Sequence, residues 1–442
     1  MASEWRLAKL GDFIKIEHGW PFKSDLYSDD LTGKPIVVSI GNFNYTGGFR
    51  FGSTLSKEYR GEYPAQYDLN PGEVLLVMTC QTAGGEILGI PARVPDDGRR
   101  YLHNQRLGKV VIKRPMEVIP DFLYFLFLTP AFNRELVNSA TGTKILHTAP
   151  SRIETFQFRL PPPHEQRAIA HILRTLDDKI ELNRRMNETL EAMARALFKD
   201  WFVDFGPTRA KMEGRAPYLA SDLWALFPDR LDDDGKPEGW EVSSIGEEIR
   251  VAGGSTPRTT EPAYWDGDIA WATPKDLSRL DAPVLFETER LITHAGLSQI
   301  SSGLLPKGTV LLSSRAPIGY VAITEIPVAV NQGFIGMVCE GRLSNVFCWL
   351  WTIFRMDEIK QRANGSTFLE ISKSNFRPIP VTVASRRILF AFDQMVRPLF
   401  TRIAHNEDES RTLAATRDLL LPKLMSGEIR VRDAEKMVEP AL

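Results

Sequence analysis

The chain has 442 residues, of which 43% are hydrophobic and 25% charged, and its net charge is −2. This composition is typical of a folded protein of two to four domains, and it excludes a disordered tail, a collagen-like fibre and a disulfide scaffold. The near-neutral balance does not by itself indicate a nucleic-acid partner, although whole-chain charge can conceal a basic face.

The longest apolar runs, residues 122–128 and 346–354, fall short of the roughly 18 residues that a membrane span needs. The N-terminal segment carries charges where a signal peptide needs an apolar stretch. The three cysteines show no metal-ligand spacing, so we expect reduced structural thiols in a cytoplasmic protein that does not contact membranes.

The chain repeats itself after about half its length. The pattern W-x-L-x-x-L-G-D at residues 5–12 returns as W-x-V-x-x-I-G-E at residues 240–247. Four further pairs of segments match in the same order: 69–76 with 305–312, 104–105 with 331–332, 141–143 with 364–366, and 160–161 with 379–380. Since the offsets fall slowly from about 236 to 219, they indicate a duplicated unit.

Each copy begins with short strand-like runs broken by Gly and Pro, which favour a β-rich α+β domain. Each copy then changes into one long helical stretch. The predicted organisation is therefore a first β-rich domain, a first long helix, a linker, a second β-rich domain, a second long helix and a C-terminal tail, at residues 1–160, 161–205, 206–238, 239–382, 383–426 and 427–442.

Both helices carry a heptad seam, with residues mostly three or four apart and, late in the second helix, seven apart, as in a coiled coil. The first seam consists of Ile169, Ile172, Leu176, Ile180, Asn183, Asn187, Leu190, Ala194 and Leu197. The second consists of Ile388, Phe392, Met395, Leu399, Ile403, Asn406, Leu413 and Leu420. Two seams of equal length most simply pack on each other as a spacer, although two core helices of a larger fold would share this pattern. Pro398 is expected to kink the second helix or to lie near a break.

Asn187 and Asn406 align at an offset of 219, and both lie on the seam. Polar seam residues fix the register of a helix pair at a cost in stability. Alternatively, the two amides are partly exposed and contact other subunits.

Motifs for catalysis are missing. The sequence has no GxxxxGK[ST] phosphate loop, and Leu160 stands where an amino-methyltransferase tetrapeptide needs Asp or Asn. Residues 228–236 spell a nuclease-like pattern without room for its hairpin and are better read as a solvated turn. The seven histidines have no metal-ligand spacing, so the sequence predicts neither a catalytic nor a metal site.

Residues 160–205 resemble the central region of the specificity (S) subunits of type I restriction–modification systems. The most distinctive segments are EQRAIA at 165–170, DDKI at 177–180, NRRMN at 183–187 and WFVDF at 201–205. Residues 417–429 resemble the ending of the same family. The second copy departs from the pattern at residues 383–387, where VASRR replaces the usual PxxEQ opening.

The resemblance implies a non-catalytic subunit whose two target-recognition domains each read one half of a split double-stranded DNA sequence. The two helices would form an antiparallel pair that sets the gap between the halves and docks two methyltransferase subunits, and restriction subunits would join them. S-adenosylmethionine, ATP and Mg²⁺ would belong to those partners rather than to this chain. Partner contacts are expected at Glu165, Gln166, Arg167, Asn183, Asn187, Trp201, Phe202, Asp204 and Phe205.

DNA binding needs Lys and Arg near phosphates and Arg, Lys, Asn, Gln or Ser at base edges. In the first domain we expect such contacts from Asn42, Asn44, Tyr45, Arg50, Lys57, Arg60, Gln81 and Lys144. In the second domain we expect them from Lys275, Arg279, Ser314, Arg315, Ser366 and Thr367. For any single residue, a solvated surface charge is the competing interpretation.

The pairs Asn104-Gln105 and Asn331-Gln332 recur in both copies, although the two domains should read different bases. We therefore expect buried amides that tie strands together. Two alternatives to the leading function stay open, namely a DNA-binding scaffold without methylase partners and a DNA-modifying enzyme with an unrecognised site.

Overall fold

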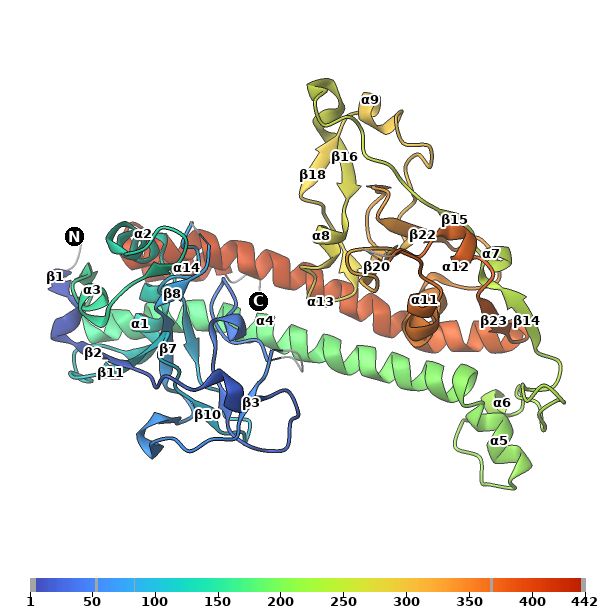
Figure 1. Ribbon diagram of the computed structural model, residues 1–442, viewed down its shortest axis with the longest axis horizontal. Helices are drawn as coiled ribbons and strands as arrows, with labels where there is room; N and C mark the ends of the chain where they lie inside the picture. Colours follow the sequence, from blue (N-terminus) through green and yellow to red (C-terminus); the bar gives the residue numbers. More distant parts are fainter. Residues whose placement is uncertain (1–4, 52–54, 83, 366–368, 439–442) are drawn as a thin grey trace. The chain divides into compact units, whose positions relative to one another are not determined.

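The computed structural model describes residues 5–51, 55–82, 84–365 and 369–438. The chain divides into two compact units: the first consists of Met1–Lys179 with Thr412–Leu442, and the second of Ile180–Arg411. Each long helix therefore contributes one segment to each unit (Figure 1).

The first unit contains small sheets built from short strands. Strand β1 (Arg6–Lys9) pairs with β13 (Gln157–Leu160), and β8 (Thr79–Cys80) pairs with β12 (Leu146–His147), both antiparallel. A four-stranded sheet has the order β2 (Ile14–His18), β11 (Leu107–Ile112), β7 (Val74–Val77) and β9 (Pro91–Arg93). A five-stranded sheet has the order β3 (Tyr27–Ser28), β5 (Glu58–Tyr59), β4 (Ile36–Val37), β10 (Tyr101–Leu102) and β6 (Asp68–Leu69).

The second unit repeats this plan with its own strands. Strand β14 (Glu241–Ser244) pairs with β23 (Pro380–Val383), as β1 pairs with β13. A five-stranded sheet has the order β15 (Arg250–Ala252), β22 (Phe334–Val338), β19 (Val310–Ser313), β20 (Val321–Thr324) and β17 (Val284–Leu285). A three-stranded sheet has the order β18 (Arg290–Ile292), β16 (Trp265–Ala272) and β21 (Ala329–Val330).

Each unit also contains short helices. In the first unit they are α1 (Pro120–Phe127), α2 (Pro130–Ser139), α3 (Pro150–Glu154), α14 (Val431–Val438) and the 3-10 turns η1 (Leu10–Asp12), η2 (Ser24–Leu26), η3 (Ile40–Asn42) and η4 (Ala65–Tyr67). In the second unit they are α5 (Gly206–Met212), α6 (Ser221–Trp224), α7 (Ile245–Glu248), α8 (Pro274–Leu277), α9 (His294–Leu297), α10 (Asn345–Phe354), α11 (Met356–Gln361), α12 (Lys373–Phe376) and η6 (Pro262–Tyr264). Residues 206–238, which we expected to be a linker, thus contain two helices.

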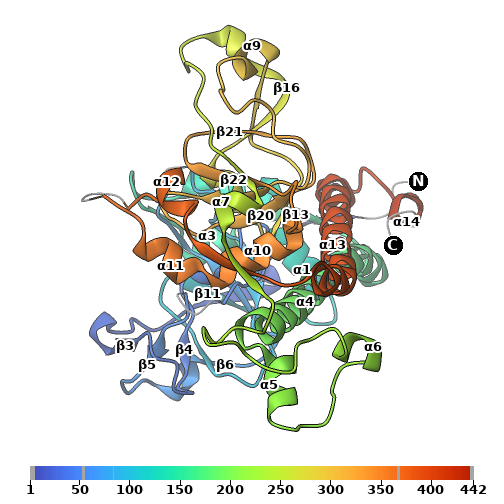
Figure 2. The same ribbon diagram turned by 90° about the vertical axis from the view of Figure 1, so that its right-hand side faces the viewer.

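The two long helices are α4 (Pro163–Phe198), which continues as the π turn η5 (Lys199–Val203), and α13 (Arg386–Ser426). Within each unit the segments of α4 and α13 lie side by side (Figures 1 and 2). In the second unit Asn183 contacts Ser410 and Asn187 contacts Asn406, so the two segments run antiparallel. Helix α13 continues through Pro398 without a break. The fold that the sequence predicted, α+β halves with an antiparallel helix pair, is confirmed.

Strand register corrects one alignment between the copies. Arg6 pairs with Leu160 in the first unit, and Glu241 pairs with Val383 in the second. Leu160 therefore corresponds to Val383, at an offset of 223, and not to Ile379. Because α4 and α13 begin at the same offset, the counterpart of Asn406 is Asn183 rather than Asn187. A two-residue sequence match had suggested the wrong offset, whereas backbone hydrogen bonds fix the register.

Candidate functional site

Four loops of the second unit meet in one place, which we call the second loop cluster. It consists of residues 253–258, 313–319, 331–333 and 364–371, of which 366–368 lie outside the described residues. The Ser255 amide donates to the Val330 carbonyl at 3.1 Å, and the Ser314 amide donates to the Gly333 carbonyl at 2.8 Å. The Ile371 amide donates to the Ser314 carbonyl at 3.0 Å. These bonds hold the four loops together.

The first unit contains the same arrangement in residues 19–23, 78–82, 103–106 and 141–148, the first loop cluster. The Trp20 amide donates to the His103 carbonyl at 2.8 Å, and the Met78 amide donates to the Arg106 carbonyl at 3.0 Å. The Thr148 amide donates to the Met78 carbonyl at 3.0 Å. Each bond joins the counterparts of the residues joined in the second loop cluster. The duplication has therefore kept one backbone scaffold in both units.

A glycine allows the closest approach of two loops in each cluster. A side-chain Cβ at Gly19 would overlap the carbonyl oxygen of Asn104, and one at Gly254 would overlap the carbonyl oxygen of Val330. These glycines are needed for backbone proximity rather than for an unusual φ angle. Neither was singled out from the sequence, although both follow the matched W-x-L/V-x-x-L/I-G segment at the same distance.

The repeated Asn-Gln pairs form a tight turn in each cluster. The side-chain oxygen of Asn104 accepts a bond from the Arg106 amide at 3.0 Å, and that of Asn331 accepts one from the Gly333 amide at 2.8 Å. Both asparagines are half-buried, whereas the glutamines that follow them are exposed. The prediction of buried amides that tie strands together was therefore wrong: the asparagine closes its own turn, and the glutamine faces solvent.

Asn42 and Ser314 are buried side chains. Asn42 is fully buried, and its side-chain oxygen accepts bonds from the backbone and hydroxyl of Ser39 at 2.8 and 2.9 Å. Asp276 occupies the matching position in the second unit and accepts from Thr273 in the same way. Ser314 is 2% exposed. We therefore correct the DNA-binding prediction for Asn42 and Ser314, because both side chains are buried.

The other predicted DNA-binding residues divide between the loop clusters and the surface around them. Gln81 and Lys144 are exposed in the first loop cluster, and Arg315 is half-buried in the second. Tyr45, with 53% of its surface exposed, lies outside the clusters together with half-buried Asn44 and exposed Arg50. Ser366 and Thr367 lie outside the described residues.

Most of the predicted basic contacts already have an acidic neighbour. Two exposed pairs are Lys57 with Asp29 and Arg60 with Asp30, each at 3.2 Å. Lys275 and Arg279 both contact Glu289 at 2.9 Å, and they hold the pKa of that carboxyl below its usual value. Arg315 lies 3.7 Å from Glu370. Exposed ion pairs of this kind are weak, so a phosphate can compete for these cations, but only by displacing a carboxylate.

His103 is a buried imidazole at the base of the first loop cluster. Its Nε2 atom lies 2.9 Å from the Leu107 carbonyl oxygen, and burial lowers the pKa of His103 to about 4. In the folded protein the His103 side chain is therefore uncharged at neutral pH. The corresponding residue of the second unit is Val330, which does not titrate.

We predict that His103 makes the first unit sensitive to acid. Because its folded pKa is lower than the unfolded value of about 6.5, its contribution to stability is complete above that pH and disappears as the pH falls towards 4. The loss amounts to about 3 kcal/mol. Urea unfolding between pH 7.5 and 4.5 should show a weaker pH dependence in His103→Val than in the unsubstituted chain. Equal pH dependence in both would contradict this assignment.

Gln166, one of the residues expected to bind a partner, is completely buried in the first unit. Its amide oxygen accepts from the Ile119 backbone at 2.8 Å, and its amide nitrogen donates to the carbonyls of Glu117 and Pro161 at 2.9 and 2.8 Å. Gln166 therefore joins the start of α1 to the start of α4 and offers no surface to a partner. Its neighbour Arg167 is exposed, and Glu165 accepts from the Trp5 indole at 2.9 Å.

Asn183 and Asn187 lie in the buried seam of the second unit. The Asn183 amide donates to Glu409 at 2.7 Å and to Ser410 at 3.2 Å, and Asn406 donates to Asn187 at 2.9 Å. These contacts favour the register interpretation of the seam amides over the alternative of partly exposed docking positions.

The WFVDF segment connects the end of α4 to the core of the second unit. Trp201 and Phe202 are buried and pack on Phe392 of α13, with ring centroids 5.7 and 4.8 Å apart. Their burial is a second correction to the docking prediction. Asp204 is exposed and half-buried Phe205 packs on Trp240, so only this end of the segment reaches the surface.

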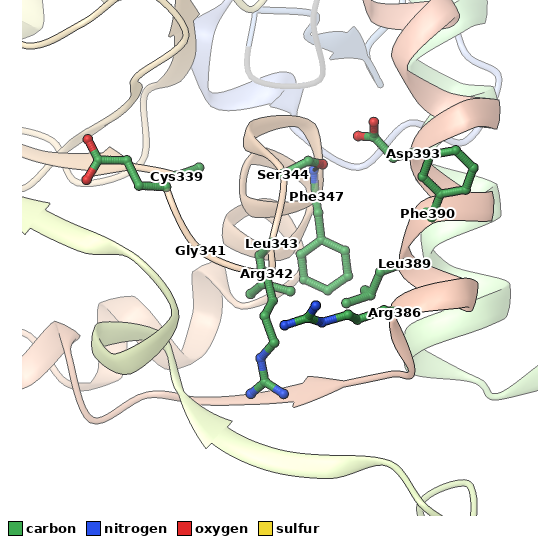
Figure 3. A pocket seen from close by; sticks show the side chains of 11 residues that line it. Cys339, Gly341, Arg342, Leu343, Ser344, Phe347, Arg386, Leu389, Phe390 and Asp393 are labelled. Atoms are coloured by element: carbon green, nitrogen blue, oxygen red, sulfur yellow. Dashed lines mark hydrogen bonds between the residues drawn. The ribbon is translucent and has the colours of Figure 1, made fainter.

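A pocket of about 660 Å³ opens beside the first turns of α13 (Figure 3). Arg342 and Phe347 line it from the loop before α10 and from α10 itself, and Arg386 and Phe390 line it from α13. Phe390 is 66% exposed. At the offset of 223, Phe390 corresponds to exposed Arg167, so the two units present different chemistry at matching places.

Within the described residues, no group of three or more His, Cys, Asp or Glu side chains is placed to hold a metal ion. In the same part of the chain, no helix combines the length and the apolar character that crossing a membrane requires.

Known proteins match this chain over most of its length. A family model for the type I restriction modification DNA specificity domain matches residues 2–192 and 237–386. The HindI specificity subunit of Haemophilus influenzae is 27% identical over 401 residues, which cover 78% of this chain and 86% of that subunit. The MjaIX specificity subunit of Methanocaldococcus jannaschii is 27% identical over 322 residues, with coverage of 72% and 70%. The crystal structure of the S subunit of a type I restriction–modification system from M. genitalium shares the fold, with a TM-score of 0.56 and 16% identity over 96% of each chain. Because the family model covers both halves, this chain belongs to the type I restriction–modification DNA specificity family, as its central helix and WFVDF segments predicted.

Proposed function

We propose that this chain is the non-catalytic subunit that selects the DNA sequence in a type I restriction–modification complex, with each unit reading one half of a bipartite target. The observation that carries the proposal is the pair of loop clusters, which share backbone hydrogen bonds but expose different side chains. A duplicated scaffold with unlike surfaces suits two different half-sites on one duplex.

The exposed and half-buried side chains of the clusters differ in the chemistry they present to base edges. Gln81 and Lys144 belong to the first cluster, and Arg315 to the second. Amides pair well with adenine and guanidinium groups pair well with guanine in the major groove. We propose that these non-repeated residues contribute to the choice of bases in each half-site.

The partners in this proposal are two methyltransferase subunits and the restriction subunits. S-adenosylmethionine, ATP and Mg²⁺ act in those partners, and the complex works in the cytoplasm, where thiols such as Cys80 and Cys348 stay reduced. Docking uses exposed positions near the helix ends, Arg167, Asp204 and the rim of the Phe390 pocket, since the buried residues are occupied within their own units.

The test is to co-express the chain with a type I methyltransferase subunit and to map methylated adenines in a plasmid library. We expect methylation confined to one split sequence. Replacing residues 1–160 with the corresponding segment of a relative should change one half of that sequence and leave the other half as it was.

Two results would contradict the proposal. Methylation that does not depend on this chain would remove its role in sequence choice, and failure to co-purify with any methyltransferase would favour a DNA-binding scaffold. Methyl transfer or strand cleavage by the purified chain alone would contradict the non-catalytic assignment.

A further inference from the structure

Some exposed side chains are repeated in both loop clusters, whereas others differ between them. Gln105 and Gln332 follow the turn-closing asparagines, and both are exposed. Lys23 lies four residues after Gly19, and Arg258 lies four residues after Gly254, so an exposed cation is repeated as well.

A hydrogen bond connects each repeated cation segment to its Asn-Gln turn, between backbone atoms in the first unit and between side chains in the second. The Gln105 amide donates to the Trp20 carbonyl at 3.0 Å, and the Thr256 hydroxyl donates to the side-chain oxygen of Gln332 at 2.7 Å. In the second cluster this contact directs the NH₂ group of Gln332 away from Thr256. We call residues 19–23 with 104–105, and 254–258 with 331–332, the paired turns.

Lys23 and Arg258 differ from four of the basic residues that the sequence had suggested, and they share with Arg50 and Lys144 the absence of an ion pair in the described part of the chain. Within the described residues, neither forms an ion pair with a carboxylate, whereas Lys57, Arg60, Lys275 and Arg279 each do. Lys23 and Arg258 therefore keep an uncompensated positive charge. Lys373 adds a further cation to the second cluster, because its ammonium group lies against Gly253.

Because these exposed residues occur in both units, we expect them to contact a part of DNA that is the same in both half-sites. The two units are expected to read different bases, so an exposed element that both share cannot supply the difference. The part of DNA that is the same in every half-site is the phosphate backbone, and phosphate contacts fix the position of a protein on the duplex without specifying sequence.

We propose that the paired turns are the phosphate-contacting elements of the two units, with Lys23 and Arg258 each neutralising one phosphate and Gln105 and Gln332 donating amide N–H bonds to phosphate oxygens. This inference rests on the proposed function and deepens it. It divides each cluster into a repeated part that positions the duplex and a variable part that reads bases.

The experiment measures the affinity of the chain, co-purified with its methyltransferase subunit, for a duplex carrying the methylated sequence and for an unrelated duplex. Fluorescence anisotropy between 50 and 200 mM KCl gives the slope of log affinity against log salt. Each of Lys23→Ala and Arg258→Ala should reduce that slope by about 0.9, and the double variant by about 1.8. Between 50 and 200 mM KCl, the factor by which affinity falls should therefore be about 3.5-fold smaller for each lost contact.

Gln105→Ala and Gln332→Ala should behave differently, because they remove neutral donors. We expect each of these substitutions to lower the affinity for both duplexes by the same factor without changing the slope of log affinity against log salt. Arg99→Ala and Lys307→Ala are matched controls, since these exposed cations lie outside the clusters and contact Asp97 and Glu325. The controls should retain the slope of the unsubstituted chain.

Two outcomes would overturn the inference: an unchanged slope in the double variant, or methylation that spreads to new sequences in a single variant. Thermal unfolding of each variant, and recovery of the slope in Lys23→Arg, exclude a folding defect. If the unsubstituted complex methylates no split sequence, the proposed function itself fails. If the unsubstituted complex does methylate one split sequence and the variants have the same salt slope, only the proposed role of the paired turns is contradicted.

Discussion

Gly254→Ala should abolish the selection of one half of the target sequence. The new methyl group would overlap the Val330 carbonyl oxygen, so residues 254–258 must move away from the Asn-Gln turn. Overpacking of this kind costs about 3 kcal/mol, and here the displaced atoms are backbone atoms that cannot rotate out of the way. Methylation mapping should show that one half of the sequence is no longer specified, and thermal unfolding should show a destabilised second unit.

The matching change, Gly19→Ala, should produce the same loss in the other half. Gly41→Ala is the control, because its φ angle is ordinary and the nearest atoms, on Ser39 and Leu55, are 3.8 and 3.9 Å from the new methyl position. This control should fold normally, and its complex with the methyltransferase should methylate the same sequence as the unsubstituted complex. A normal methylation pattern in Gly254→Ala would show that the contact between the two loops is not needed for recognition.

Arg417→Met should destabilise the first unit by about 2–3 kcal/mol. Arg417 of α13 is 9% exposed and donates to Asp177 of α4 at 2.8 Å. Burial raises the pKa of the Asp177 carboxyl, and Arg417 offsets part of that shift. Without the guanidinium, the half-buried Asp177 carboxylate is left without its partner. Urea unfolding at pH 7.5 measures the change.

The double variant Asp177→Leu/Arg417→Met distinguishes two effects on stability, namely the cost of leaving Asp177 without a partner and the net stabilisation from the ion pair. Replacing both charges with apolar groups should restore stability to within about 1 kcal/mol of the unsubstituted chain, because buried pairs gain little over apolar contacts. If the double variant is as unstable as Arg417→Met, the pair itself stabilises the helix contact.

The sequence could predict the architecture because its signals extend over many residues. Five ordered matches indicated the duplication, and the heptad spacing from Ile169 to Leu197 predicted the buried face of α4. Of that seam, Ile169, Leu176 and Asn183 are buried as expected. Propensity and periodicity sum over such windows, so single errors do not change the result.

Individual site residues could not be predicted in the same way, because burial depends on contacts between distant segments. Asn42 and Asp276 differ in type, yet both close the first turn of a short helix. Gln166 belongs to a recognisable family segment, but only the structure brings the Glu117 carbonyl to its amide. The loop clusters join four segments each, and no local pattern in the sequence links Met78 to Arg106.

The division of the chain also determines the order in which the units can form during synthesis. The second unit, Ile180–Arg411, is one continuous stretch, whereas the first needs Thr412–Leu442 in addition to its N-terminal portion. Arg417 and α14 therefore reach the first unit only after the whole second unit has been made, although domains usually fold in N-to-C order. Until residues 412–438 have been made, the apolar face of α4 around Ile172 and Leu176 lacks the later segment that completes the first unit, so the nascent N-terminal portion is left with unburied apolar side chains.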